Sequence, residues 1–140
     1  MLDNNKNQNV IAFSVAAIMA NGVYDAAEKG AVFSIAESFE INEKTMLDAI
    51  DTEIAKQKAM SDEELIAYLK DISKDLSPED TVEIYQICIV ITLADGKLCK
   101  METMKLVAFA EILQIHTVYA TMLIAYAVNK DPNFTVEFSL

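Results

Sequence analysis

Hydrophobic residues recur every three or four positions along most of this chain, and short polar stretches separate the runs. That spacing places an apolar face on each of several helices. Only three glycines and two prolines interrupt the 140 residues, which favours long helices with short connections. Seven helices are predicted: one over about residues 10–20, four that begin near residues 25, 42, 61 and 77, one that carries the apolar positions of residues 101–113, and one over about residues 117–129.

Polar residues at the predicted helix starts support these boundaries. Ser61 and Glu64 have the spacing of a capping box, in which each side chain bonds a backbone N–H near the other. Ser77 before Pro78 is typical of a helix start, because serine accepts from a free N–H and proline has none to satisfy. The segment that follows, residues 84–94, is apolar nearly all round, so we expect its helix to be central and buried.

These observations predict an all-α fold, a compact bundle of about seven helices. β-Branched residues in the central segment suit a strand on propensity alone, but the strong helix start before them favours a helix. Met46, Met104 and Phe109 fall on helical spacings and are expected in the core.

The chain also contains an internal repeat. Residues 20–41 and 94–115 match when Gly22 is aligned with Gly96, 74 residues later. In each copy the aligned glycine lies six residues before a matching glutamate. A repeat of this kind indicates two copies of one supersecondary unit packed together. We therefore predict a bundle built from two helix-loop-helix repeats.

The charge balance narrows the choice of partners. Twenty-two acidic residues against eleven lysines, with no arginine, give a net charge of −11. This charge would repel a nucleic-acid backbone, and no guanidinium group is present to read bases, so nucleic acid is excluded as a partner. Residues 42–83 contain twelve acidic and five basic residues, so most of the excess negative charge lies in the middle of the chain. This segment is either a solvated helical surface or a docking surface for a protein with a basic surface.

Two cysteines and an apolar segment near the N-terminus indicate in which cellular compartment the protein is expected. Cys88 and Cys99 have neither CxxC nor zinc-type spacing and are predicted to be reduced thiols. Residues 10–20 resemble the apolar part of a signal peptide, but no excess of positive charge precedes them, and their removal would destroy the first repeat. No apolar run is long enough for a transmembrane helix. We therefore expect a cytoplasmic protein.

The segment from Asp95 to Glu102 matches part of the sequence pattern of a calcium-binding loop. Asp95, Gly96 and Glu102 fit the second half of an EF-hand pattern. The earlier ligand positions would be Ile91 and Leu93, whose side chains cannot bind calcium. An EF-hand is therefore excluded.

What remains at this turn is a candidate divalent-cation site formed by Asp95 and Glu102. Both side chains continue apolar helix faces, so both carboxylates are expected near one crevice between helices. The alternative is that Glu102 bonds the N-terminus of its own helix while Asp95 organises the turn. The first-copy counterparts, Asn21 and Glu28, form a weaker candidate because Asn21 carries no charge.

Other candidate chemistry is limited. Glu37 and Glu111 repeat as well, but each lies half a turn from the first glutamate of its copy and is expected to be exposed or part of an acidic patch. His116 follows Glu111 at the wrong spacing for a di-iron pair, so it is expected to cap a helix or lie on the surface. One histidine completes no catalytic constellation, and there is no glycine-rich phosphate loop. We expect no enzymatic activity and no cofactor besides the candidate divalent cation.

The paired corners, Ala–Asn–Gly and Ala–Asp–Gly each followed by a glutamate, resemble the tellurite-resistance TerB-like family over about residues 10–128. The resemblance implies one compact helical domain over residues 1–140, with repeat one at about 10–58 and repeat two at about 84–128. It also implies acidic surface patches and a role in bacterial stress, tellurite and metal responses. The resemblance places the acidic corner of the family on Asp95 and Glu102 in the second copy and on Asn21 and Glu28 in the first. Asn21 departs from the family pattern, because it is not acidic.

We therefore expect a non-enzymatic module that acts by protein interaction, with divalent-cation sensing at the acidic corner. The alternative is a purely structural acidic protein that docks a basic partner without metal. An acid–base enzyme that uses buried carboxylates is the least supported alternative. Tyr119, Met122 and Tyr126 enrich the last helix in residues favoured at interfaces, so that helix forms either a homodimer or partner surface or part of the core.

Overall fold

The computed structural model describes residues 5–20, 26–130, 133 and 135–136, without the side chains of residues 26–28 and 135–136. This part of the chain contains seven helices and one pair of two-residue strands, and the predicted all-α bundle is thereby confirmed. The elements in chain order are α1 (Asn5–Ala20), α2 (Ala26–Ser38), α3 (Glu43–Lys58), α4 (Asp62–Ser73), α5 (Pro78–Thr92), β1 (Lys97–Leu98), α6 (Lys100–Ile112), α7 (Thr117–Asn129) and β2 (Thr135–Val136).

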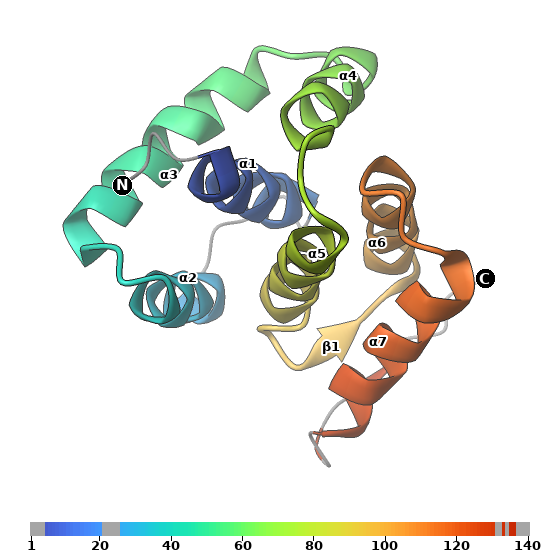
Figure 1. Ribbon diagram of the computed structural model, residues 1–140. Coiled ribbons are helices and arrows are strands. Elements are labelled where there is room, and N and C mark those ends of the chain that lie inside the picture. The colour runs from blue at the N-terminus through green and yellow to red at the C-terminus, as the bar shows by residue number, and fades with distance from the viewer. Residues whose placement is uncertain (1–4, 21–25, 131–132, 134, 137–140) are drawn as a thin grey trace.

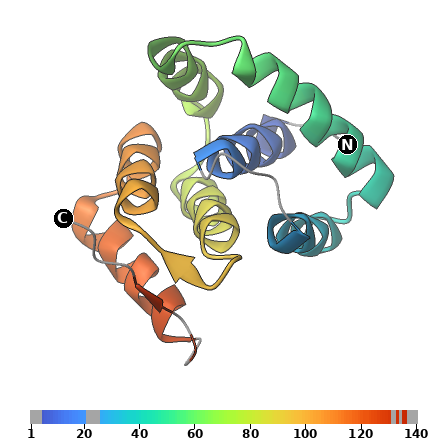
Figure 2. The same ribbon diagram turned by 180° about the vertical axis from the view of Figure 1, so that it is seen from behind.

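Helices α1 and α5 pack against each other at the centre, and the other helices surround them (Figures 1 and 2). α2 and α3 lie on one side of this central pair, α6 and α7 lie on the other, and α4 lies at one end. α1 also packs on α3, α4 and α6, while α5 packs on α2, α6 and α7. The two predicted repeat regions thus meet through their central helices.

The central position of these two helices follows from their all-round apolar sequences. α1 is buried at every residue from Asn9 to Ile18. α5 is buried at seven of the nine residues from Ile84 to Thr92, as predicted for this apolar segment. Phe13 of α1 meets Phe109 of α6 edge to face, with ring centroids 6.2 Å apart, which joins the centre to the second half of the bundle.

α1 begins at Asn5, earlier than the predicted start near residue 10, because tertiary contacts hold its polar first turns. Lys6 Nζ lies 2.8 Å from the Glu83 carboxylate of α5. Asn9 Nδ2 donates a hydrogen bond to the Ile72 carbonyl of α4 at 2.9 Å. Neither contact is visible in the periodicity of the N-terminal sequence itself.

The prediction that Met104 lies in the core is wrong. Met104 is 57% exposed, whereas Met46 and Phe109 are buried as predicted. The reason is helical geometry: α6 turns Leu106 toward the core, and a residue two positions away lies on the opposite side of the helix. Methionine alone does not indicate burial.

The 74-residue spacing seen in the sequence also relates the helix boundaries. α2 and α6 have corresponding first and last residues at this spacing, and α3 and α7 have corresponding first residues. Glu40 and Gln114, which correspond in the same way, end their helices with left-handed φ values of 55° and 59°. Asn42 and His116 then cap α3 and α7. The two-repeat organisation stays a prediction, which these matching corners support.

A short parallel pairing ties the end of the chain to the α5–α6 connection. Lys97 pairs with Thr135 and Leu98 with Val136. None of the helices in the described ranges has the length and apolar character needed to cross a membrane.

Candidate functional site

Asp95 lies in the turn that follows α5. Gly96 follows it with a φ of 78°, a left-handed conformation that glycine adopts without strain. The Asp95 side chain is exposed, and its Oδ1 accepts a hydrogen bond from the backbone N–H of Lys97 at 3.1 Å. Asp95 therefore organises the turn. This role was the predicted alternative to binding a cation.

Glu102 lies in the first turn of α6 and is only 6% exposed. Its Oε1 accepts a hydrogen bond from the backbone N–H of Cys99, the residue before the helix, at 3.0 Å. This bond is the returning half of a capping box and satisfies a free donor at the helix start. The other carboxylate oxygen, Oε2, is buried and has no hydrogen-bond partner among the described residues.

This corner supplies fewer ligands than a closed metal site requires. No group of three or more His, Cys, Asp or Glu side chains in the described part of the chain is placed to hold a metal ion. Calcium takes roughly six to eight oxygen ligands, whereas magnesium commonly uses one or two carboxylates and keeps several waters. Two carboxylates, of which that of Asp95 is exposed and that of Glu102 is buried, are therefore too few for a dehydrated calcium site.

The other residues singled out in the sequence are Asn21, Glu28, Glu37, Glu111 and His116. Asn21 and the Glu28 side chain lie outside the described residues. Glu37 of α2 and Glu111 of α6 are both exposed. His116 is exposed too, and its Nδ1 accepts a hydrogen bond from the Val118 backbone N–H at 3.2 Å. It therefore caps α7, as the sequence predicted for one of its two possible roles.

Both cysteines are free thiols. Cys88 is fully buried in α5, with its Sγ 3.8 Å from the Phe13 carbonyl oxygen. Burial raises the pKa of the Cys88 thiol far above its ordinary value. Because the thiolate is the reactive form of cysteine, Cys88 is not a nucleophile at neutral pH.

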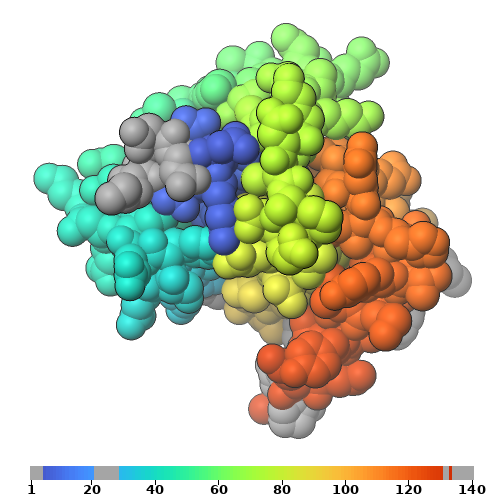
Figure 3. Space-filling model, in the orientation of Figure 1, coloured from blue at the N-terminus to red at the C-terminus, as the bar shows by residue number. Residues whose placement is uncertain are grey.

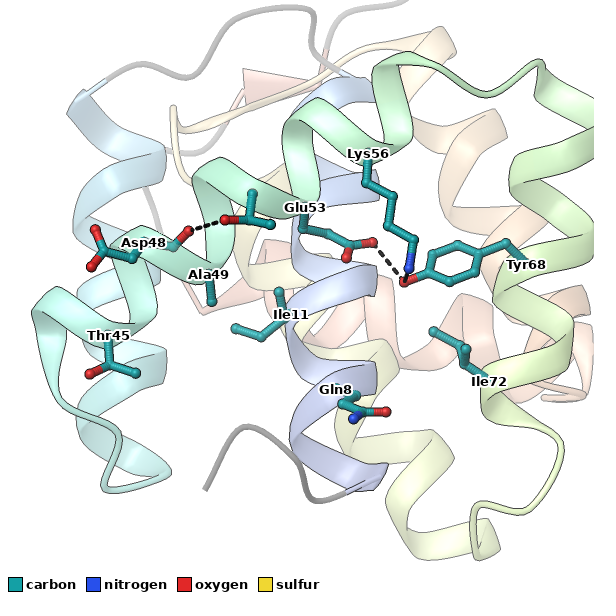
Figure 4. A pocket seen from close by; sticks show the side chains of 10 residues that line it. Gln8, Ile11, Thr45, Asp48, Ala49, Glu53, Lys56, Tyr68 and Ile72 are labelled. Atoms are coloured by element: carbon teal, nitrogen blue, oxygen red, sulfur yellow. Dashed lines mark hydrogen bonds between the residues drawn. The ribbon is translucent and has the colours of Figure 1, made fainter.

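A second candidate site, which the sequence reasoning did not identify, lies between α3 and α4 (Figure 4). It is a pocket of about 560 Å³ over α1, where Ile11 forms part of its floor. Asp48 and Glu53 line the α3 side, and Tyr68 and Ile72 line the α4 side. The polar α3 residues that line it recur within three to five positions of one another, which places them on one side of the helix. The sequence does not show which neighbouring helix this side faces.

The Glu53 carboxylate in this pocket is held by two neighbours. Its Oε2 accepts hydrogen bonds from the Tyr68 hydroxyl at 2.9 Å and from Gln57 Nε2 at 2.8 Å. Gln57 Nε2 also donates to the Ala12 carbonyl of α1 at 2.9 Å, which anchors the arrangement in the core. Lys56 Nζ lies 3.3 Å from the Tyr68 hydroxyl oxygen and 4.4 Å from the centre of its ring. The pocket thus presents a carboxylate of fixed orientation.

The protonation of Tyr68 favours the same arrangement. Partial burial, together with the hydrogen bond to the Glu53 carboxylate, raises the pKa of the Tyr68 phenol well above its ordinary value. Tyr68 therefore remains neutral over the physiological pH range and continues to donate to Glu53.

Fold and sites together define a small, acidic, all-helical domain with a capped corner and a polar pocket between two helices. The sequence model of the family described as "Tellurite resistance protein TerB" matches residues 7–122. Because this match spans most of the 140 residues, the chain belongs to the TerB family. The family prediction is confirmed, and with it the coarse function of a tellurite-resistance-type module. No curated protein and no solved structure matches the chain.

Proposed function

We propose that this TerB-family chain is a non-catalytic interaction module whose α3–α4 surface docks a basic segment of a partner protein. The observation that carries the proposal is the fixed Glu53 carboxylate in a pocket on the most acidic part of the chain. Residues 42–83, which form α3, α4 and the start of α5, contribute −7 of the net −11. A potential of this sign attracts basic partners and repels acidic ones.

The charges are separated along the pocket in a way that suits a single basic side chain. Figure 4 shows Lys56 and Tyr68 at one end, Asp48 at the other, and Glu53 between them. A lysine or arginine of the partner fits between Asp48 and Glu53, with its methylene groups on Ile11 and its charge near the Glu53 carboxylate. Because Tyr68 already orients Glu53, little side-chain freedom is lost when the partner binds.

Fluorescence anisotropy with a labelled oligo-arginine peptide tests this docking. The Asp48→Asn/Glu53→Gln variant is expected to bind about tenfold more weakly, because each removed carboxylate contributes on the order of 0.5 to 1 kcal/mol at a partly exposed site. Asp51→Asn is the control for the loss of a single charge, since Asp51 is exposed on the same helix and does not line the pocket. Added salt should weaken binding for all three proteins.

Two outcomes would contradict the docking proposal. Equal affinity of the double variant and the Asp51→Asn control would exclude the pocket as the site. Absence of peptide binding by the wild-type protein at low salt would overturn the proposed function itself.

The non-catalytic part of the proposal is supported by the roles of the reactive side chains. His116, the single histidine of the sequence, caps a helix through Nδ1, and the Cys88 thiol is buried. No turnover is expected in a screen of ester, phosphate and peptide substrates. Turnover that disappears with an Asp48→Asn/Glu53→Gln variant would refute this part.

Divalent-cation sensing at the α5–α6 corner is a second candidate function, favoured by the buried Glu102 Oε2 that has no described partner. Isothermal titration with magnesium, calcium and zinc tests it, with Asp95→Asn/Glu102→Gln as the variant that removes both carboxylates. Glu111→Gln, an exposed change on the same helix, is the control. Heat above buffer that only the double variant loses supports the site, whereas identical heats in all three proteins exclude it.

A further inference from the structure

α7 is an apolar helix that is hardly buried. Its 13 residues include no charged side chain, yet Ala120 is the residue of α7 that is buried. Val118, Tyr119, Met122 and Tyr126 are 62%, 48%, 66% and 63% exposed. These four form one stripe, and Leu123 and Ile124 on the other side pack against the core. A helix that is apolar all round normally has neighbours on both sides.

The spacing of 74 residues shows how this side of α7 differs from its counterpart on α3. At this spacing α7 corresponds to α3, so that Met122 corresponds to Asp48 and Tyr126 to Thr52. On α3, both of these residues line the pocket whose other wall is helix α4. Asp48 and Thr52 are exposed and polar, whereas the corresponding side of α7 is exposed and apolar, and both ribbon views place α7 at the outer edge of the bundle (Figures 1 and 2). The apolar character of this side is therefore particular to α7, and packing within the described part of the chain does not account for it.

The exposed side of α7 contains both protruding and hollow features. A hollow of about 430 Å³ lies between α5 and α7 and is lined by Val90, Leu93 and Tyr126 among others. A second, of about 650 Å³, follows α7 past Tyr119 and Met122. Tyr126 lines both hollows, so they adjoin the same part of α7. Figure 3 shows α7 as a ridge along the lower right edge of the molecule.

We propose that this surface is the interface of a homodimer, in which the α7 helices of two copies pack across a two-fold axis near Met122. An antiparallel crossing at that residue places Met122 against Met122 of the partner subunit and Val118 beside Tyr126 of the partner subunit. Each copy then receives the protruding side chains of the other in its own hollow. Such self-complementarity is what a two-fold interface requires.

Charge favours a second copy at this place. Two chains of net charge −11 repel each other, and the α3–α4 surface carries most of that charge. The stretch Thr117–Asn129 has none, so two copies can approach there without burying an unpaired carboxylate. Lys130, at the end of the helix, lies with Nζ 4.6 Å from the centre of the Tyr126 ring and is held at the rim.

The exposed area is of the right order for a dimer. Large side chains bury on the order of 150 to 250 Å² each, so four that are about half to two-thirds exposed offer roughly 400 Å² per copy. A standard interface takes about 800 Å² per partner. The walls of the two hollows, including Val90 and Leu93, supply further apolar surface. This inference is independent of the proposed docking pocket, because α3 and α7 lie at opposite edges of the bundle (Figure 1).

Sedimentation equilibrium or light scattering after gel filtration measures the proposed state. The wild-type chain is expected at about twice its mass of 15.5 kDa at micromolar concentrations. Met122→Glu should weaken self-association at least about tenfold, because it buries a carboxylate at the centre of the interface. Ile66→Glu is the control, since Ile66 is an exposed apolar residue on α4, away from α7. Unchanged helical circular dichroism of both variants confirms that they fold.

Disulfide cross-linking supplies a second, geometric readout. In a Cys99→Ser background, Met122→Cys should form a covalent dimer on mild oxidation, whereas Met104→Cys, equally exposed on α6, should not. A wild-type chain that stays monomeric up to about 100 µM would overturn the proposal. So would a dimer that Met122→Glu leaves intact, or a monomer whose α7 surface instead captures an amphipathic helix of a different protein.

Discussion

Glu102 offers the sharpest test of how the α5–α6 corner works, because two substitutions separate its possible roles. Glu102→Ala removes the acceptor for the Cys99 backbone N–H. Glu102→Gln keeps an oxygen at the same position and removes only the charge and the unpartnered carboxylate oxygen. If the cap is what stabilises the corner, the alanine variant should lose much more stability than the glutamine variant.

The expected magnitudes follow from the geometry. A hydrogen bond to a charged group contributes about 1.5 to 3 kcal/mol, and a helix cap typically contributes about 1 kcal/mol. Glu102→Ala is therefore expected to lower the free energy of unfolding by about 2 kcal/mol. Glu102→Gln should lower it by at most about 1 kcal/mol, because the hydrogen bond to Cys99 is kept as a weaker neutral bond and the attraction of the charge to the helix dipole is lost.

Equilibrium urea unfolding measures both changes, and for a chain of this length each kcal/mol corresponds to about 4 °C in Tm. Glu111→Ala is the control on the same helix and should lie within about 0.5 kcal/mol of wild type. Equal losses for the alanine and glutamine variants would refute the cap argument, because they would show that charge and not the hydrogen bond matters. Magnesium should raise the Tm of the wild-type protein alone if Glu102 Oε2 also binds a cation.

Three further predictions concern the core. Burial raises the pKa of both Cys88 and Tyr85, so the unfolded chain releases these protons first, near pH 8.5 and 10 respectively. The stability that these two groups contribute should therefore be fully present at pH 7 and fall as pH rises through that range, as urea midpoints at pH 7, 9 and 10.5 will show. Tyr85→Phe should cost about 1 kcal/mol in the same assay, because the Tyr85 hydroxyl donates to the Leu106 carbonyl at 3.0 Å inside the core. Met46→Ala should cost about 2 to 5 kcal/mol and Met104→Ala less than about 0.5 kcal/mol, and similar losses for the two would contradict the burial assigned to them.

The parts of the fold that local chemistry determines were predictable from the sequence. Ser61 and Glu64 form the expected capping box, and Ser77 with Pro78 begins α5 as expected, because a cap involves residues only a few positions apart. The true start of α1 was not predictable in this way. Its first turns are held by Glu83 and by the Ile72 carbonyl, which are distant in sequence. A helix boundary set by tertiary contacts leaves no local signal.

The same distinction explains what could be predicted of the sites. The turn at Asp95 and the cap at Glu102 each depend on a backbone N–H two or three residues away, and their alternative roles were readable in advance. The pocket at Glu53 depends on Tyr68 of another helix and on the Ala12 carbonyl of a third, through Gln57. A sequence shows that these residues are polar, but only the packing of α1, α3 and α4 shows that they meet.

The two halves of the bundle share helix boundaries but differ in surface, and this difference links the two proposals. α3 bears carboxylates such as Asp48 where α7 bears Met122, so one half repels a second copy while the other permits it. A dimer through α7 therefore carries two acidic α3–α4 surfaces that face away from the interface. Two sites on one particle bind a surface coated with basic peptide more tightly than one site does, since the second contact is intramolecular.

Met122→Glu should for this reason weaken binding to immobilised oligo-arginine peptide about tenfold or more while leaving binding of the free peptide unchanged. Surface plasmon resonance and solution anisotropy measure the two quantities. Met104→Glu is the control here, because it adds the same negative charge at an exposed position on α6, outside both the α3–α4 surface and α7. An equal effect of Met122→Glu on free and immobilised peptide would mean that α7 contacts the peptide directly. The assignment of docking to the acidic α3–α4 surface and of dimerisation to the neutral α7 surface would then be wrong.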